Sequence, residues 1–123
     1  MPVIRKAEAP VFELFGVKVV GLASPRRGAQ ETSVWQLELP PGAPAVPHRV
    51  TREEIFVGLS GSADVTLAGV PHELSAGDAL LVPAGVEFSL ANPRAEPFRA
   101  VVALPVGGQA VTGEGTFTPP WAE

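Results

Sequence analysis

The chain of 123 residues contains no cysteine, which excludes disulfides, thiolate metal ligands and thiol nucleophiles. Basic residues are also few, with nine Lys and Arg against thirteen Asp and Glu. The resulting net charge of -4 argues against nucleic-acid binding, which requires clustered basic side chains. No apolar run reaches the ~18 residues that a membrane-spanning helix needs, and the first ten residues lack the apolar segment of a signal peptide. We therefore expect a cytoplasmic protein without nucleic-acid or membrane partners.

Proline and glycine, in contrast, are abundant, with fourteen and thirteen residues. Inside a helix, Pro costs about 3 kcal/mol and Gly about 1 kcal/mol relative to Ala. The longest segment free of both runs only from Ala29 to Leu39, so a helical domain is excluded. The length suits one domain, residues 1–123, with a core that buries roughly two-thirds of the unfolded chain's surface.

Short apolar segments between turn signals predict strands. In residues 33–39, Trp35, Leu37 and Leu39 alternate with the residues of the other face. Gly61 suggests a hairpin between residues 54–61 and 62–69, and Pro83 must end the strand before it. Residues 107–123 form a tail rich in coil. The further candidate strands lie within residues 12–23, 73–85, 86–93 and 98–106. This pattern predicts an all-β sandwich or barrel.

Two groups of residues have the spacing of conserved motifs, over residues 42–61 and 77–92. They resemble the two motifs of the cupin superfamily, whose members fold as a double-stranded β-helix, or jelly-roll barrel. The matching residues are Gly42, His48, Glu54 and Gly61 in the first motif, and Gly77, Pro83, Gly85 and Asn92 in the second. The resemblance implies an all-β, single-domain cupin of the small bacterial type.

The resemblance also implies a metal site, from which this sequence departs. Family members hold the metal with two His and one Glu of the first motif and one His of the second. Here His48 and Glu54 are retained, but Val50 and Phe88 occupy the other two positions. Zinc sites use three or four protein ligands, and non-haem Fe(II) sites use two His and one carboxylate. We therefore expect no metal cofactor, and His48 and Glu54 would hold a divalent ion only weakly.

The parity of residues 48, 50 and 54 predicts that they face one side, if the strand parity survives the intervening bend. The expected ligand-binding residues around one apolar cavity are His48, Val50, Glu54, Phe56 and Phe88. Within this set, His48 and Glu54 form a candidate catalytic acid/base pair. The simpler alternative is that the His48 ring only hydrogen-bonds Glu54 inside a packed barrel.

Gln36 is the sixth candidate for ligand binding. Gln36, or Glu38 on the same face, could supply a third oxygen ligand if this face of the strand points inward, although the opposite face, with Trp35, could equally be the core. The second histidine, His72, is expected to be exposed.

Three hypotheses for function stay open. The leading one is a cupin that binds a small, partly apolar organic molecule without a tightly bound metal. The second is an enzyme, either a divalent-metal dioxygenase or isomerase with a nonstandard third ligand, or a proton-transfer catalyst that uses the pair alone. The third is a structural or regulatory barrel with a filled interior. The apolar N-terminal strands also predict a homodimer, because exposed sheet edges need covering.

Overall fold

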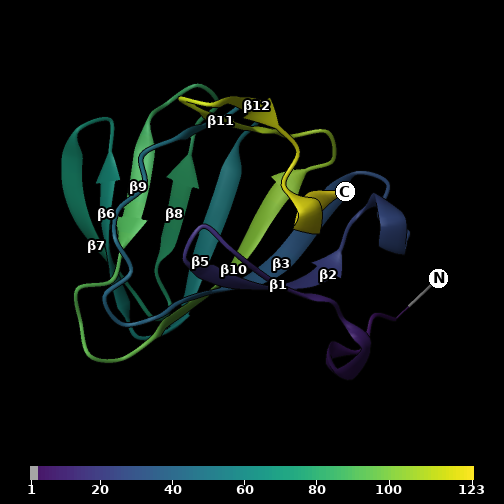
Figure 1. Cartoon of the computed structure of the whole chain (residues 1–123), viewed down its shortest axis with the longest axis horizontal. Coiled ribbons are helices and arrows are strands. Elements are labelled where there is room, and N and C mark those ends of the chain that lie inside the picture. Colours follow the sequence, from purple (N-terminus) through teal and green to yellow (C-terminus); the bar gives the residue numbers. More distant parts are fainter. Residues whose placement is uncertain (1–2) are drawn as a thin grey trace.

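The computed structural model describes residues 3–123. Within them, twelve strands and three short 3₁₀ helices follow one another along the chain (Figure 1). The strands are β1 Val11–Leu14, β2 Val17–Ala23, β3 Thr32–Leu39, β4 Arg49–Val50, β5 Glu54–Ser60, β6 Ser62–Leu67, β7 Val70–Ser75, β8 Ala79–Val82, β9 Phe88–Ala91, β10 Phe98–Pro105, β11 Ala110–Thr112 and β12 Gly115–Phe117. The 3₁₀ helices are η1 Lys6–Glu8, η2 Pro25–Arg27 and η3 Pro120–Ala122. None of the helices in residues 3–123 has the length and apolar character to cross a membrane.

The strands form antiparallel sheets that enclose the core. One sheet has the order β1-β2-β3-β10-β5-β8, a second the order β7-β6-β9, and a third the order β12-β11-β4. Figure 1 shows β6, β7 and β9 on one side of the molecule, β1 to β3 on the other, and the β11–β12 hairpin across one end. The all-β jelly-roll barrel predicted from the sequence is confirmed.

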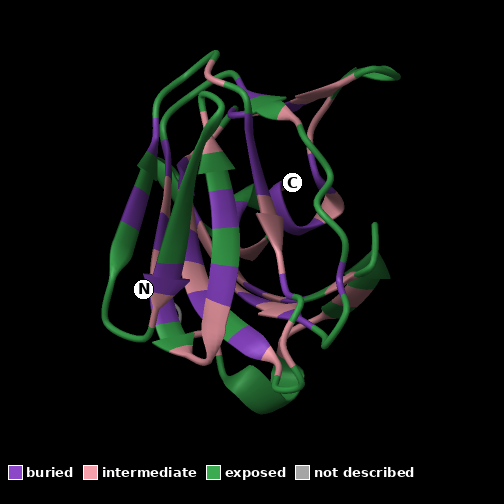
Figure 2. Ribbon diagram, turned by 90° about the vertical axis from the view of Figure 1, so that its left-hand side faces the viewer, coloured by how far each residue is buried: buried purple, intermediate pink, exposed green. Residues whose placement is uncertain are grey.

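Buried and more accessible residues alternate along the central strands of the barrel. In β3 every second residue from Ser33 to Leu39 is buried, and in β10 every second residue from Phe98 to Leu104 is buried. Figure 2 shows the same succession of buried and less buried residues along the strands. Because side chains of a strand point to alternate faces, one face of each central strand forms the core and the other remains accessible.

Most of the strands lie within the segments that the sequence predicted. Strand β8 ends at Val82, directly before Pro83, because proline cannot donate to a ladder hydrogen bond. The predicted hairpin at Gly61, however, is wrong. Strand β5 pairs with β10 and β8, whereas β6 pairs with β7 and β9, so the chain changes sheets between them.

The crossing at Gly61 explains why glycine occupies this position. Its φ of 73° lies in the left-handed region, and a Cβ atom there would lie 2.4 Å from the backbone oxygen of Pro97. A side chain at residue 61 would therefore suffer both backbone strain and a collision with the segment that leads into β10.

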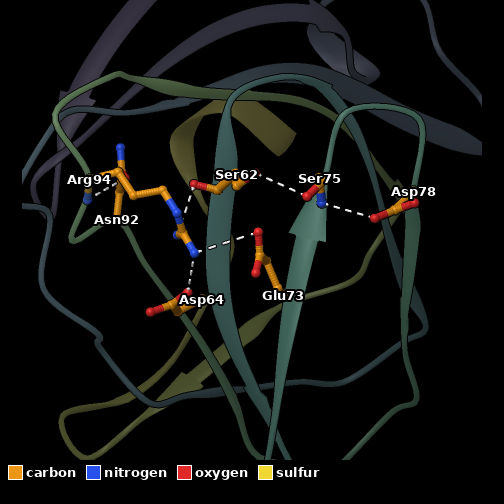
Figure 3. Close-up of polar contacts among 7 residues, drawn as sticks. All are labelled: Ser62, Asp64, Glu73, Ser75, Asp78, Asn92 and Arg94. Atoms are coloured by element: carbon orange, nitrogen blue, oxygen red, sulfur yellow. Dashed lines mark hydrogen bonds and ion pairs between the residues drawn. The ribbon is translucent and has the colours of Figure 1, made fainter.

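Asn92, the last residue of the second motif, has a structural role. Its side chain is fully buried, and its Nδ2 atom donates hydrogen bonds to the backbone oxygens of Leu39 at 3.1 Å and Glu96 at 2.8 Å. Its Oδ1 atom accepts a hydrogen bond from the backbone N–H of Arg94. The Arg94 side chain adds a second link, because its Nη2 atom lies 2.9 Å from Oδ1 of Asp64 on β6 (Figure 3). Asn92 thus ties the end of β9 to β3 and to the loop before β10.

The tail is more regular than its composition suggested. It forms the β11–β12 hairpin and helix η3, in which Trp121 is buried against Trp35 of β3 with ring centroids 6.2 Å apart. An ion pair between Arg26 and Glu123, 2.8 Å long, holds the end of the chain to η2. This packing brings Trp121 into the wall of the barrel cavity.

Candidate functional site

A cavity of about 170 Å³ opens into the barrel between the sheets. Most of its lining is apolar, and residues of both sequence motifs contribute to it. The lining residues are Phe15, Gly16, Val17, Trp35, Leu37, Leu39, Ala43, Pro44, Val46, His48, Val50, Glu54, Phe56, Phe88, Leu90, Leu104, Ala110, Thr112, Phe117, Pro119 and Trp121. The only ionisable side chains in this set are those of His48 and Glu54.

Glu54 opens strand β5 and points into the barrel. It lies opposite Val82 of β8, and the alternation of β5 turns Glu54 and Phe56 to the same buried face. Only 5% of Glu54 is exposed, and its carboxyl group has no hydrogen bond or ion pair recorded with any of residues 3–123. Burial raises the pKa of Glu54 from 4.5 to about 8, because the apolar surroundings penalise the charged form. At neutral pH the group is therefore mainly a protonated acid.

His48 lies beside Phe88 at the cavity. The backbone N–H of each residue donates to the backbone oxygen of the other at 3.0 Å, and the two rings have centroids 4.4 Å apart. The His48 Nδ1–H donates to the backbone oxygen of Val46, at 3.0 Å. This bond places the proton of the neutral ring on Nδ1 and leaves Nε2 as a hydrogen-bond acceptor.

The simpler interpretation of His48, a hydrogen bond to Glu54, is not found among the described residues, where the ring instead forms its hydrogen bond with the backbone oxygen of Val46. The two groups line one cavity without a direct bond. His48 and Glu54 could therefore contact the same ligand, each through a separate hydrogen bond.

Five of the six predicted ligand-binding residues line this cavity: His48, Val50, Glu54, Phe56 and Phe88. The parity across residues 48, 50 and 54 thus survives the bend between β4 and β5. Gln36 is the exception and a correction. The inward face of β3 carries Trp35, Leu37 and Leu39, so Gln36 lies on the outer face and does not line the cavity.

Sequence reasoning missed part of the aromatic wall. Trp121 comes from η3, Phe117 from β12, and Phe15 from the turn between β1 and β2. The rings of Phe15 and Phe117 lie 5.9 Å apart near the cavity opening, where Phe15 is 61% exposed. For Trp121, the sequence indicated only that so large an aromatic side chain would pack against the rest of the protein.

Comparison with known proteins identifies the family. Residues 35–104, more than half of the chain, match the family described as the cupin domain.

The chain belongs to the cupin family.

Solved structures of low sequence identity share the fold of this cupin. The polyketide cyclase RemF from Streptomyces resistomycificus superimposes with a TM-score of 0.77 and 20% identity, over 85% of this chain and 79% of that one. An RmlC-like cupin from Shewanella frigidimarina gives a TM-score of 0.74 and 18% identity, over 85% and 90% of the two chains. At these identities the likeness shows the fold alone.

One curated relative matches this cupin at higher identity over a shorter region. Dimethylsulfoniopropionate lyase DddW from Ruegeria pomeroyi is 47% identical over 57 residues. The matched region covers 46% of this chain and 38% of the relative, so the comparison includes less than half of either protein.

The donor set of this cupin does not fit the metal that the family implies. Val50 and Phe88 occupy the other two ligand positions, and both line the cavity with hydrocarbon. Within residues 3–123, no group of three or more His, Cys, Asp or Glu side chains is placed to hold an ion. His48 and Glu54 alone supply two donors, fewer than zinc or non-haem iron sites require.

Proposed function

We propose that this cupin binds a small, partly apolar organic molecule in the barrel cavity, without a tightly bound metal, and that His48 and Glu54 contact it. One observation carries the proposal: the carboxyl group of Glu54, a residue only 5% exposed, lines an apolar cavity and forms no hydrogen bond within residues 3–123. Leaving a buried polar group unsatisfied costs about 1–3 kcal/mol. A ligand with a matching polar or charged group would recover this free energy, and its apolar part would contact the aromatic wall.

The size of the cavity limits the ligand. Its volume of about 170 Å³ is close to that of an engineered apolar cavity of ~150 Å³ that binds benzene. It is smaller than the ~300–1,000 Å³ of sites for drug-sized molecules. The dimensions favour a ligand of roughly benzene size over a barrel whose side chains fill the interior.

Thermal unfolding with small probes tests this proposal. We expect 3,3-dimethylbutan-1-ol and its charged analogue choline to raise the melting temperature of the wild type, because a ligand that binds only the folded state stabilises it. His48→Ala should lose most of the shift given by the better probe. His72→Ala is the matched control, because His72 is exposed on β7. Equal shifts in the two variants would contradict the role of His48.

Proton transfer is a second candidate function, favoured by the raised pKa of Glu54. Groups that transfer protons near neutral pH work best with pKa values near the operating pH. The partial match to a dimethylsulfoniopropionate lyase suggests a first substrate. Loss of dimethylsulfoniopropionate, followed by NMR, should occur with the wild type and stop with Glu54→Gln if this cupin is a lyase. Persistence of the substrate would leave the binding function as the conclusion.

We also propose a homodimer and a cytoplasmic location. Strand β1 lies at the edge of the six-stranded sheet, and its Val11 and Leu14 are 56% and 39% exposed. An apolar edge strand of this kind is suited to pair with a second copy. The cytoplasmic location stays a prediction from the composition.

A further inference from the structure

We propose that the cavity selects small organic cations, such as quaternary ammonium compounds, over neutral or anionic molecules of the same shape. The inference rests on the proposed binding function and specifies the chemical class of the ligand. It is carried by three features of the cavity: its aromatic wall, the absence of Lys and Arg from its lining and the position of its single carboxyl group.

The aromatic wall is the first feature. The chain has six Phe and two Trp, and six of these eight residues line the cavity. Phe56 and Phe88 lie with ring centroids 5.9 Å apart in an edge arrangement, and Trp35 and Trp121 lie 6.2 Å apart. A cation within ~6 Å of an aromatic ring centroid is attracted by the negative ring face, by about 0.5–2 kcal/mol. Aliphatic walls would give no such preference for charge.

The charge of the lining is the second feature. The set of lining residues includes no Lys or Arg. The nearby basic residue Arg49 is exposed and forms an ion pair with Glu87, 3.6 Å long. A carboxylate or phosphate ligand would therefore lose its hydration without gaining a Lys or Arg partner, which is unfavourable.

The position of the carboxyl group is the third feature. Glu54 and Phe56 project from the same face of β5, and Phe88 packs against Phe56. An ammonium group beside an ionised Glu54 would thus contact both a negative charge and aromatic rings. His48 is the other titratable group at the cavity, and in its neutral form the ring offers Nε2 as an acceptor. With Glu54 ionised, the site can compensate a positive charge, whereas its lining includes no permanently charged Lys or Arg to compensate a negative one.

Calorimetric titration with three probes of similar size and branching tests the proposal. Choline carries a trimethylammonium group, 3,3-dimethylbutan-1-ol is its neutral carbon analogue, and 3,3-dimethylbutanoate carries a negative charge on the same branched skeleton. The titrations are run at about pH 9, where Glu54 is mainly ionised. We expect choline to bind at least about tenfold more tightly than the alcohol, and the alcohol more tightly than the carboxylate.

Two variants and one control variant test which groups cause the preference for the cation. Glu54→Gln keeps the shape of the side chain and removes the charge, so it should reduce choline affinity about tenfold and change the affinity for the alcohol by less than about twofold. Glu53→Gln, the same change at the exposed neighbouring residue, should leave both affinities unchanged. Phe88→Leu removes one aromatic ring, so it should reduce the affinity for choline more than the affinity for the alcohol.

The outcomes separate this inference from the function on which it rests. If the alcohol binds as tightly as choline, the preference for cations is overturned and the small-molecule site remains. A choline affinity that Glu54→Gln and Glu53→Gln change equally would also overturn the inference. If none of the three probes binds the wild type, both the cation preference and the proposed site are overturned.

Discussion

At the scale of single residues, Glu54 is a buried carboxylic acid in apolar surroundings. A carboxyl group normally accepts hydrogen bonds or an ion pair when it is buried. Glu54 instead has its pKa raised to about 8 by burial alone. The chain retains an acid at a position where an apolar residue would pack at lower cost, which is typical of a residue kept for binding or chemistry.

The raised pKa predicts how stability depends on pH. Between about pH 4.5 and pH 8 the folded chain holds a proton on Glu54 that the unfolded chain has released. Stability therefore falls as the pH rises through this window and levels off above it. At roughly 1.4 kcal/mol per pKa unit, the contribution amounts to a few kcal/mol. Urea unfolding at several pH values should show this slope in the wild type and lose it in Glu54→Gln.

Glu53→Gln is the control for this experiment, because Glu53 is exposed one residue away. It should retain the slope of the wild type. The same slope in Glu54→Gln and in the wild type would mean that the carboxyl group of Glu54 is solvated in the folded protein, and the description of the site would then be wrong.

At the scale of elements, the corner at Gly61 predicts a large effect of a small change. Gly61→Ala introduces a Cβ atom at 2.4 Å from the Pro97 backbone oxygen in addition to an unfavourable φ. Gly69→Ala is the matched control, because Gly69 has a similar φ of 80° and no neighbouring atom within 4 Å of the added Cβ. The control should cost about 1–2 kcal/mol, and Gly61→Ala clearly more.

Chemical denaturation of the two variants checks this prediction. Equal losses of unfolding free energy would show that the β5–β6 crossing can relax away from Pro97. The comparison isolates the collision, because the backbone strain is common to both glycines.

Individual strands could be predicted because their signals are local. Pro83 ends β8, and the alternation of β3 marks its two faces. Pairing depends on segments far apart in the chain, so the sequence suggested a hairpin at Gly61 where the chain crosses between sheets. The same distinction holds for the site. Parity placed His48 and Glu54 together, whereas Trp121 reaches the cavity only through the packing of the tail.

At the scale of the whole molecule, the open edge of the six-stranded sheet predicts self-association through β1. Val11→Lys replaces an exposed apolar side chain of this edge strand with a charge, which is a common way for proteins to prevent edge pairing. Light scattering coupled to size exclusion should give a dimer for the wild type and a monomer for the variant. A dimer of unchanged affinity in Val11→Lys would place the interface elsewhere.

The central claim is that this barrel holds a small organic ligand against Glu54 and no fixed ion. A crystal structure of protein purified without chelator and grown with choline tests it most directly. We predict ligand density beside the Glu54 carboxyl group, within about 6 Å of the Phe56 and Phe88 rings, and no metal. A transition metal on the His48 imidazole at about 2.0–2.1 Å, or a cavity filled by side chains, would contradict the claim.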